Sequence, residues 1–332
     1  MKNVNIAVVG ATGLVGRTIV QVLEERDFPV DNIYFLSSER SAGKNIRFKN
    51  REYIVEELTE SSFDRDIDIA LFAAGGAVSQ RFAPIAVEKG IQVIDNSSVF
   101  RMNKDVPLIV PEVNPEDIRE SKGIIANPNC STIQSVIPLK PLHDRYKIKR
   151  VVYSTYQAVS GSGLGGIKDL EEGNVEFYPY QIQYNVIPHI DVFLDNRYTK
   201  EEMKMIDETK KILKDDDIKI TATTVRVPVK YGHSISANIE FENPFEIEDI
   251  EKALENFQGI VLKDELKHNI YPMPIDIQGK DQVYVGRIRR DYTLDNGINI
   301  WIVADNVRKG AATNAVQIAE IVAKNILEGA KR

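Results

Sequence analysis

A strand followed by a glycine-rich turn opens the chain, and this pair constrains the fold more than any other feature. Residues 4–9 form an apolar run that predicts a buried strand, and the turn Gly-Ala-Thr-Gly-Leu-Val-Gly follows it directly. An apolar pattern with helical spacing begins after the turn. Glycine turns also join strands to helices without a ligand, but the backbone N–H groups in such a turn can bind a pyrophosphate at the helix N-terminus. We therefore expect a nucleotide site at residues 10–16.

The residues after the second predicted strand, 33–36, bear on the choice of cofactor. In nucleotide-binding parallel sheets an acid at this position binds the ribose hydroxyls of NAD, whereas an arginine binds the 2′-phosphate of NADP. Here Ser38, Arg40 and Ser41 follow the strand and favour NADP. Glu39 is the argument for NAD, unless its side chain points to solvent. We expect NADP as the cofactor.

Small or polar residues also follow the next two predicted strands, at 67–72 and 91–94. Ala73 and Gly75 would let a cofactor approach the backbone, although such residues also form tight turns without a ligand. Arg101 comes shortly after the fourth strand, where it can bind a phosphate or carboxylate or, like most single arginines, lie at the surface. Strands and helices in this order predict an α/β fold with a Rossmann-type parallel sheet.

The only cysteine of the chain, Cys130, follows Asn-Pro-Asn, between a β-branched run and an apolar segment of helical character. Asn-Pro-Asn ends the strand, and Ser131 and Thr132 would open the helix. A thiol at a helix N-terminus meets unpaired N–H groups and the helix dipole, which favour its anion and make it a nucleophile. A lone cysteine is more often a small buried apolar residue. The position of Cys130 favours the nucleophile.

A second glycine loop, which contains Ser160 and Gly161, comes after a predicted strand at 151–156 and Gln157. This loop is either a connector or a set of N–H groups for a cofactor or an oxyanion. Farther on, strict alternation would place Arg226 and His233 on opposite faces of a strand. A turn or bulge at Pro228 and Gly232 would bring the two side chains together. We expect the other three histidines to be structural or exposed.

A capping box at residues 199–202 predicts the start of a helix. Glu201 and Lys204 are three residues apart on this helix and share one face. Their spacing alone favours a solvated ion pair.

Composition restricts the class of function. The chain has 332 residues, which suit about two domains, and a net charge of -7, which argues against nucleic acid as a partner. One cysteine excludes an intrachain disulfide framework and is compatible with the cytoplasm. No apolar run is long enough to predict a membrane span, and no metal-binding motif is present. We therefore expect a cytoplasmic protein without a metal.

Taken together, these motifs resemble the aspartate-semialdehyde dehydrogenase family, in the form common in Gram-positive bacteria. The resemblance covers nearly the whole chain, and the stretch Asn-Pro-Asn-Cys-Ser-Thr is its most specific part. The matching segments are GATGLVG, SSERSAG, IDNSSVFRM, VPEVN, IIANPNCSTIQ, STYQAVSGSG, EEMKMIDETKKI, VRVPVKYGHS, YPMP, VGRIRRD and GAATNAVQIAE.

The resemblance implies NADPH-dependent reduction of aspartyl 4-phosphate to aspartate 4-semialdehyde, with release of phosphate, in the pathway to lysine, threonine, methionine and isoleucine. Cys130 would form the thioester, His233 would be the acid–base partner, and Gln157 would orient the acyl group. Arg226 would bind the substrate α-carboxylate and Glu201 its ammonium, while Arg101, Asn129 and Lys204 would hold the phosphate. The expected NADP contacts are Gly10, Thr12, Gly13, Leu14, Val15, Gly16, Ser38, Arg40, Ser41, Ala73, Gly75, Ser160, Gly161 and Asn314.

The resemblance also implies two domains and a homodimer. Residues 1–127 with 311–332 would bind NADP, and residues 128–310 would form an α+β domain for catalysis and dimerisation. N-Acetylglutamyl-phosphate reductase is the nearest alternative, although its cysteine segment usually reads His-Pro-Gly-Cys. A non-catalytic NADP-sensing protein with a Rossmann domain is the alternative from another class.

Overall fold

The computed structural model describes residues 3–329 and divides the chain into two units. Met1–Pro128 and Ala311–Arg332 form the N-terminal unit, and Asn129–Gly310 form the second unit. The boundary expected from the sequence lies one residue earlier, at 127. The outer ends of the expected ranges, residues 1–2 and 330–332, lie outside the described residues.

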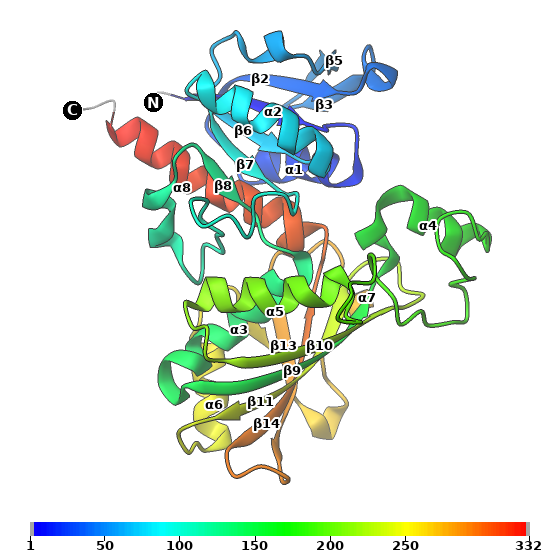
Figure 1. Ribbon diagram of the computed structural model, residues 1–332, viewed down its shortest axis with the longest axis vertical. Coiled ribbons are helices and arrows are strands. Elements are labelled where there is room, and N and C mark those ends of the chain that lie inside the picture. Colours follow the sequence, from blue (N-terminus) through cyan, green and yellow to red (C-terminus); the bar gives the residue numbers. More distant parts are fainter. Residues whose placement is uncertain (1–2, 330–332) are drawn as a thin grey trace. The chain divides into compact units, whose positions relative to one another are not determined.

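The N-terminal unit contains a six-stranded parallel sheet in the order β5-β2-β1-β6-β7-β8 (Figure 1). All six residues of β1 are buried, including Asn5, the one polar residue in an otherwise apolar run. The strands are β1 (Val4–Val9), β2 (Val30–Ser37), β5 (Glu56–Glu57), β6 (Ile69–Phe72), β7 (Gln92–Asp95) and β8 (Ile124–Ala126). A separate hairpin is formed by β3 (Asn45–Phe48) and β4 (Arg51–Ile54).

Helices cover this sheet on both faces. The apolar residues of α1 (Leu14–Glu25) and α8 (Thr313–Gly329) pack in one core cluster, and those of α2 (Gly76–Glu88) pack in another. Short 3-10 turns lie at η1 (Glu39–Ser41), η2 (Glu60–Phe63) and η3 (Pro115–Glu120). This arrangement confirms the predicted α/β fold with a Rossmann-type sheet.

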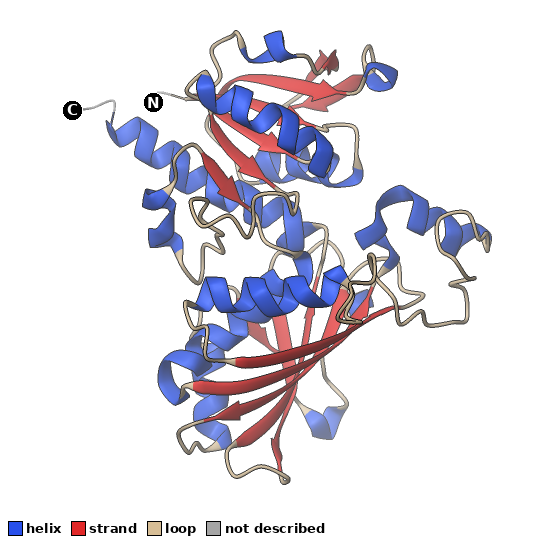
Figure 2. Ribbon diagram, in the orientation of Figure 1, coloured by secondary structure: helices blue, strands red, loops and turns tan. Residues whose placement is uncertain are grey.

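The second unit contains a mixed sheet (Figure 2). Its six strands lie in the order β10-β9-β11-β14-β13-β12. Strand β9, next to the edge strand β10, pairs in parallel with β10 and antiparallel with β11. The strands are β9 (Ile148–Gln157), β10 (Lys219–Arg226), β11 (His233–Phe241), β12 (Ile260–Leu262), β13 (Val283–Asp291) and β14 (Gly297–Ala304).

Three helices pack on one face of this mixed sheet, and the other face is only half-buried. The covering helices are α3 (Cys130–Tyr146), α5 (Lys200–Leu213) and α6 (Ile247–Glu255). Tyr153 of β9 points toward α5 and is fully buried. Tyr156, three residues farther along the same strand, points to the opposite face and is 41% exposed. The remaining short elements are η4 (Val159–Ser162), α4 (Gly163–Glu172), η5 (Leu266–His268), α7 (Pro274–Ile277) and the π-helical turn η6 (Arg308–Ala312).

Within the described range 3–329, none of the helices has both the length and the apolar character that crossing a lipid bilayer requires. Three of the candidate site residues in the second unit lie together at one end of the strands of its sheet. β9 and β10 end there, at Gln157 and Arg226, and β11 begins there, at His233.

Candidate active site

Cys130 is the first residue of α3 and is partly exposed. The helix is capped by Asn129, whose side-chain oxygen accepts the backbone N–H groups of Ser131 and Thr132 at 2.9 and 3.2 Å. The helix thus begins at Cys130, one residue before the Ser-Thr pair from which the sequence predicts its start. The structure places the thiol in the first helical turn, where the helix dipole favours an anion.

The face of α3 that carries Cys130 also contacts the start of β11. Gln134 follows Cys130 by one helical turn, so the two side chains share a face. The Gln134 side chain donates a hydrogen bond to the backbone oxygen of His233, at 3.2 Å. Cys130 therefore lies one helical turn from a residue that contacts His233.

His233 is completely buried, and its two ring nitrogens differ. Nδ1 accepts the backbone N–H of Ala158 at 2.9 Å, whereas Nε2 is buried and has no hydrogen-bond partner. Burial and the positive charge of Arg226 hold the pKa of His233 well below its usual value. The imidazole is therefore neutral near pH 7.

Arg226 and His233 point toward the same small space beside Gly161. A Cβ atom on Gly161 would lie 3.0 Å from Nη1 of Arg226 and 3.2 Å from Nε2 of His233. Nη1 also donates to the backbone oxygen of Ala158 at 2.7 Å. The turn between β10 and β11 thus brings together two residues that strict alternation would separate.

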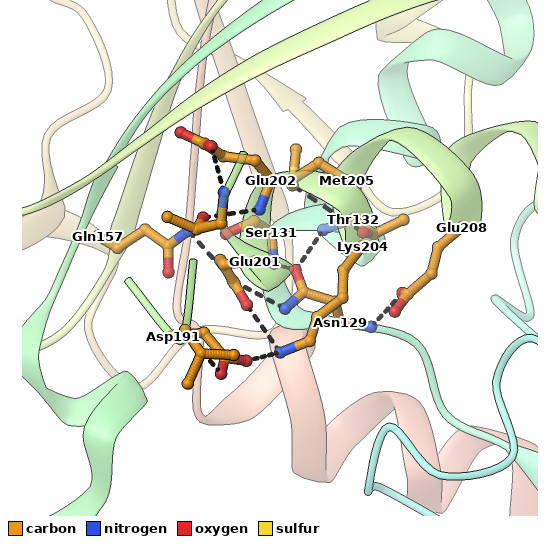
Figure 3. A network of polar contacts seen from close by, with 12 residues as sticks. Asn129, Ser131, Thr132, Gln157, Asp191, Glu201, Glu202, Lys204, Met205 and Glu208 are labelled. Carbon is orange, nitrogen blue, oxygen red and sulfur yellow. Dashed lines mark hydrogen bonds and ion pairs between the residues drawn. The ribbon is translucent and has the colours of Figure 1, made fainter. Parts of the chain in front are cut away.

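A buried polar network joins α3, β9 and α5 (Figure 3). One carboxylate oxygen of Glu201 accepts hydrogen bonds from the side chains of Asn129, at 2.9 Å, and Gln157, at 3.3 Å. The other oxygen lies 3.1 Å from the Lys204 ammonium. Glu201 is only 5% exposed, so the solvated ion pair that spacing alone favours is wrong.

Lys204 also binds Asp191, with its ammonium 2.7 Å from the carboxylate (Figure 3). Burial acts to raise the pKa of Glu201, but the charge of Lys204 and the hydrogen bond from Asn129 outweigh it and hold that pKa below its usual range. Burial likewise acts to lower the pKa of Lys204, but Glu201 and Asp191 raise it. Both groups are therefore charged, and the network presents both signs of charge.

The glycine turn in the N-terminal unit lies tightly against β6. Gly10 has φ +84°, and a Cβ atom there would lie 2.7 Å from the backbone of Ala73. A Cβ atom on Gly16 would lie 2.2 Å from the Gly10 oxygen, so α1 packs directly on the turn. Thr12 hydrogen-bonds to Ser37 at 2.9 Å and to Ser41 at 3.3 Å, which ties the turn to the end of β2.

A cleft of about 480 Å³ opens beside this turn. Its walls come from the turn, the end of β2, β5, the end of β6 and α2, and include Gly10, Thr12, Gly13, Ser38, Glu39, Glu57, Ala73 and Arg81. A close-packed glycine turn bordering a cleft at the carboxyl ends of parallel strands fits a dinucleotide. Leu14 and Val15 begin α1 beside it, and Gly75 caps α2 with φ +87°.

The other predicted ligand residues lie in different surroundings. Arg40 is exposed and Ser41 half-buried in η1. Arg101 is 8% exposed and donates to the backbone oxygens of Asn127 and Asn96, at 2.9 and 2.8 Å. Asn314 is fully buried and donates to the Ile109 oxygen and the Asn127 side chain, at 2.9 and 2.7 Å.

Several residues that shape the site carry no signal in the sequence pattern. Asn306 donates to Ser160 Oγ at 2.9 Å and accepts the Gly232 N–H at 3.0 Å, so it joins the second glycine loop to the turn before His233. Glu208 accepts the backbone N–H of Asn129 at 2.6 Å. Gly310, in the π-helical turn η6, packs on Cys130, because a Cβ atom there would lie 2.9 Å from Cys130 Cβ.

Among residues 3–329, no group of three or more His, Cys, Asp or Glu side chains is placed to hold a metal ion. The chemically active groups described above for the second unit are the Cys130 thiol, the His233 imidazole, the Arg226 guanidinium and the Glu201–Lys204 pair.

Comparison with known proteins gives consistent matches. A family model described as semialdehyde dehydrogenase, NAD binding domain, matches residues 5–121, and one described as semialdehyde dehydrogenase, dimerisation domain, matches residues 139–309. Aspartate-semialdehyde dehydrogenase of Aquifex aeolicus is 54% identical over 96% of this chain and 98% of its own length. That of Bacillus subtilis is 49% identical over 97% and 98%.

Two solved structures extend the likeness to the fold. Aspartate semialdehyde dehydrogenase II of Vibrio cholerae, complexed with ASA, has a TM-score of 0.94 at 48% identity and covers 98% of this chain and 99% of its own. The enzyme of Candida albicans with NADP has a TM-score of 0.79 at 28% identity and covers 98% of this chain and 100% of its own.

Proposed function

Because the chain belongs to the aspartate-semialdehyde dehydrogenase family, we propose that it reduces L-aspartyl 4-phosphate to L-aspartate 4-semialdehyde with NADPH, and catalyses the reverse reaction with phosphate. The observation that supports this most is the placement of Cys130 in the first turn of α3, on the helix face that contacts His233. A nucleophile so placed can form a thioester, which divides one difficult displacement into two easier steps.

The charged groups of the second unit match the charges of this substrate. Arg226 would bind the α-carboxylate through its planar fork, and Glu201 would bind the ammonium. Lys204, Asn129 and Arg101 would hold the phosphate. Gln157, hydrogen-bonded to Glu201, would orient the acyl group, and His233 would serve as the acid–base partner beside Gly161.

The cofactor site would use the glycine turn and its cleft in the N-terminal unit. The close-packed glycines support a dinucleotide at this turn, and the bound cofactor would supply the hydride that reduces the thioester. Arg40 and Ser41 in η1, with Ser38 before them, favour NADP over NAD, and the Candida relative was solved with NADP. Ser160 and Gly161 in the second unit, and Asn314 at the start of α8, would complete the set.

We also propose a homodimer that forms through the half-buried face of the mixed sheet. The matching family model for residues 139–309 is described as a dimerisation domain. On this face Tyr156 and Trp301 pack at 5.5 Å between ring centroids, and Tyr156 remains 41% exposed. An aromatic pair with one exposed ring and one half-buried ring, on a sheet face that α3, α5 and α6 do not cover, is typical of a subunit interface.

The test is phosphate-dependent reduction of NADP, and of NAD, with aspartate semialdehyde. We expect Cys130→Ala to abolish turnover while NADPH affinity stays nearly unchanged. Lys140→Ala, which removes a half-buried side chain paired with Asp144 on the same helix, serves as the control and should retain turnover. Turnover by Cys130→Ala near the wild-type rate would exclude the thioester mechanism.

The same assay separates the two alternatives. N-Acetylglutamyl-phosphate reductase would prefer N-acetylglutamate semialdehyde, whose amine is blocked and would leave buried Glu201 without a cation from the substrate. A non-catalytic sensor would bind NADPH but turn over neither semialdehyde.

A further inference from the structure

The hydrogen bond at Nδ1 of His233 determines which ring nitrogen carries the proton. A backbone N–H can only donate, so the Nδ1 atom that accepts it from Ala158 at 2.9 Å must present its lone pair. A neutral imidazole carries one proton, which must then be on Nε2. A side-chain partner could reverse its role by rotation, but a backbone amide cannot.

The surroundings of the ring keep it in this state. Nε2 is buried, has no hydrogen-bond partner and faces the space that Gly161 leaves open. Arg226, whose guanidinium borders the same space, is the charged group that acts on the imidazole and disfavours a second proton. The buried ring is therefore neutral and presents an N–H to whatever occupies this space.

We propose that the Ala158 N–H fixes His233 as the Nε2–H tautomer, so that His233 acts in the acylation step as a hydrogen-bond donor to the leaving oxygen and not as the base that deprotonates Cys130. This inference rests on the proposed function, and it assigns to the Ala158 backbone a positioning role. The thiol would instead lose its proton to solvent before substrate binds, because the N-terminus of α3 favours the thiolate.

The proton balance of the reaction agrees with a donor. The thiolate sulfur of Cys130 forms a bond to the acyl carbon, and the bond from that carbon to the phosphate oxygen breaks while Nε2–H donates a hydrogen bond to that oxygen. The released phosphate takes its proton from solvent. The bound cofactor would supply the hydride that reduces the thioester, and collapse of the resulting alkoxide would expel the same thiolate. Cys130 begins and ends as an anion, so one proton enters in total, from solvent, and His233 keeps its own.

The direct test is ¹⁵N NMR of the histidine rings in the whole protein without substrate. We expect the His233 spectrum near neutral pH to show a proton on Nε2 and none on Nδ1. His143, whose Nδ1 accepts the Ile148 N–H at 3.2 Å, is an internal reference for the same tautomer. The His233→Asn spectrum identifies the signals, and a variant with glutamine at His143, His189 and His268 identifies them independently. A proton on Nδ1 of His233, alone or with one on Nε2, would overturn the proposal.

A second test separates the donor from a base by its effect on the thiol. We expect iodoacetamide to alkylate Cys130 in His233→Ala at a rate within a few-fold of the wild-type rate, while turnover falls by about 10²-fold or more. An equal loss in both rates would show that His233 generates the thiolate, and would overturn the donor role while leaving the thioester intact. The failure of the proposed function would look different, because neither semialdehyde would then turn over in the wild type.

Discussion

At the scale of single residues, the site depends on a glycine, Gly161, as much as on its charged and polar side chains. Gly161 has no positive φ angle, so its conformation does not require glycine. What requires glycine is the space between its Cα and the polar ends of Arg226 and His233, which a methyl group would reach at 3.0–3.2 Å. The residue thus keeps both groups accessible to a ligand.

We therefore predict that Gly161→Ala impairs catalysis without unfolding the protein. The added methyl group would displace Arg226 Nη1 or His233 Nε2 from its position, and a misplacement on this scale costs about 10²-fold in rate. Steady-state kinetics with aspartate semialdehyde, together with thermal unfolding, measures the two effects. Leu164→Ala, which truncates an exposed side chain in the neighbouring helix, is the control. Wild-type kinetics in Gly161→Ala would mean that the space has no role.

The protonation of His233 makes a second prediction, which concerns stability. Its pKa in the folded protein lies well below the ordinary value of 6.5, because the ring is buried and Arg226 is positive. As the pH falls through 6.5, the unfolded chain takes up a proton at this residue that the folded protein does not, so folding loses stability down to the lower, folded pKa. Denaturant unfolding above and below pH 6.5 measures this loss.

We expect His233→Asn to lose less stability on acidification than the wild type over this range, because the variant lacks the titrating ring. The quantity to compare is the change in the free energy of unfolding with pH, not its absolute value. The same pH dependence in the two proteins would show that the ring titrates normally in the folded state.

At the scale of elements, α5 carries two charged ligand candidates and is fixed at its first turn. Thr199 and Glu202 form the predicted capping box, with the Glu202 N–H donating to Thr199 Oγ1 at 3.2 Å. The Glu202 carboxylate accepts the backbone N–H of Thr199 through Oε2, at 2.8 Å, and the backbone N–H of Thr224 through Oε1, at 3.1 Å. The capping box thus joins the helix to β10 near Arg226.

Removing this cap should destabilise the protein and the site together. We predict that Thr199→Ala lowers the free energy of unfolding by about 1 kcal/mol, the usual contribution of a helix N-cap. Thr199→Ser keeps the hydroxyl and should retain most of that stability. Denaturant unfolding measures the difference. Equal stability of the Ala and Ser variants would show that the hydroxyl contributes nothing.

Elements are also where the sequence was most and least informative. The largely apolar run of β1, the glycine turn and the Thr199 capping box are local signals, and each corresponds to an observed element. The surroundings of Glu201 are not local, because they depend on α5 packing against α3. Spacing within one helix cannot reveal that packing, and so it predicted an exposed pair.

The alignment of Gln157, Arg226 and His233 was equally beyond sequence patterns. These residues belong to three strands, and they meet because β9 lies between β10 and β11 in the sheet. A single sequence does not give the strand order. Asn306 and the Ala158 N–H were missed for the same reason, since each acts through a contact between distant segments.

At the scale of the whole molecule, the half-buried sheet face predicts the oligomeric state. Tyr156 and Trp301 lie on the face without covering helices, and a charge there would be costly to bury in an interface. We expect Tyr156→Glu to shift the protein from dimer to monomer, as measured by analytical ultracentrifugation. Lys219→Glu, at an exposed end of β10, is the control and should remain dimeric. A fully dimeric Tyr156→Glu would place the interface elsewhere.

The pairing of Lys204 with both Glu201 and Asp191 bears on the design of inhibitors. A compound that carries only an anionic head would compete with two carboxylates already held by this ammonium, and would gain little for the exchange. If the anion of a compound displaced Glu201 from Lys204, a cation on the same compound could pair with the Glu201 carboxylate in place of Lys204. Zwitterionic scaffolds are therefore the better starting points for inhibitors directed at these residues.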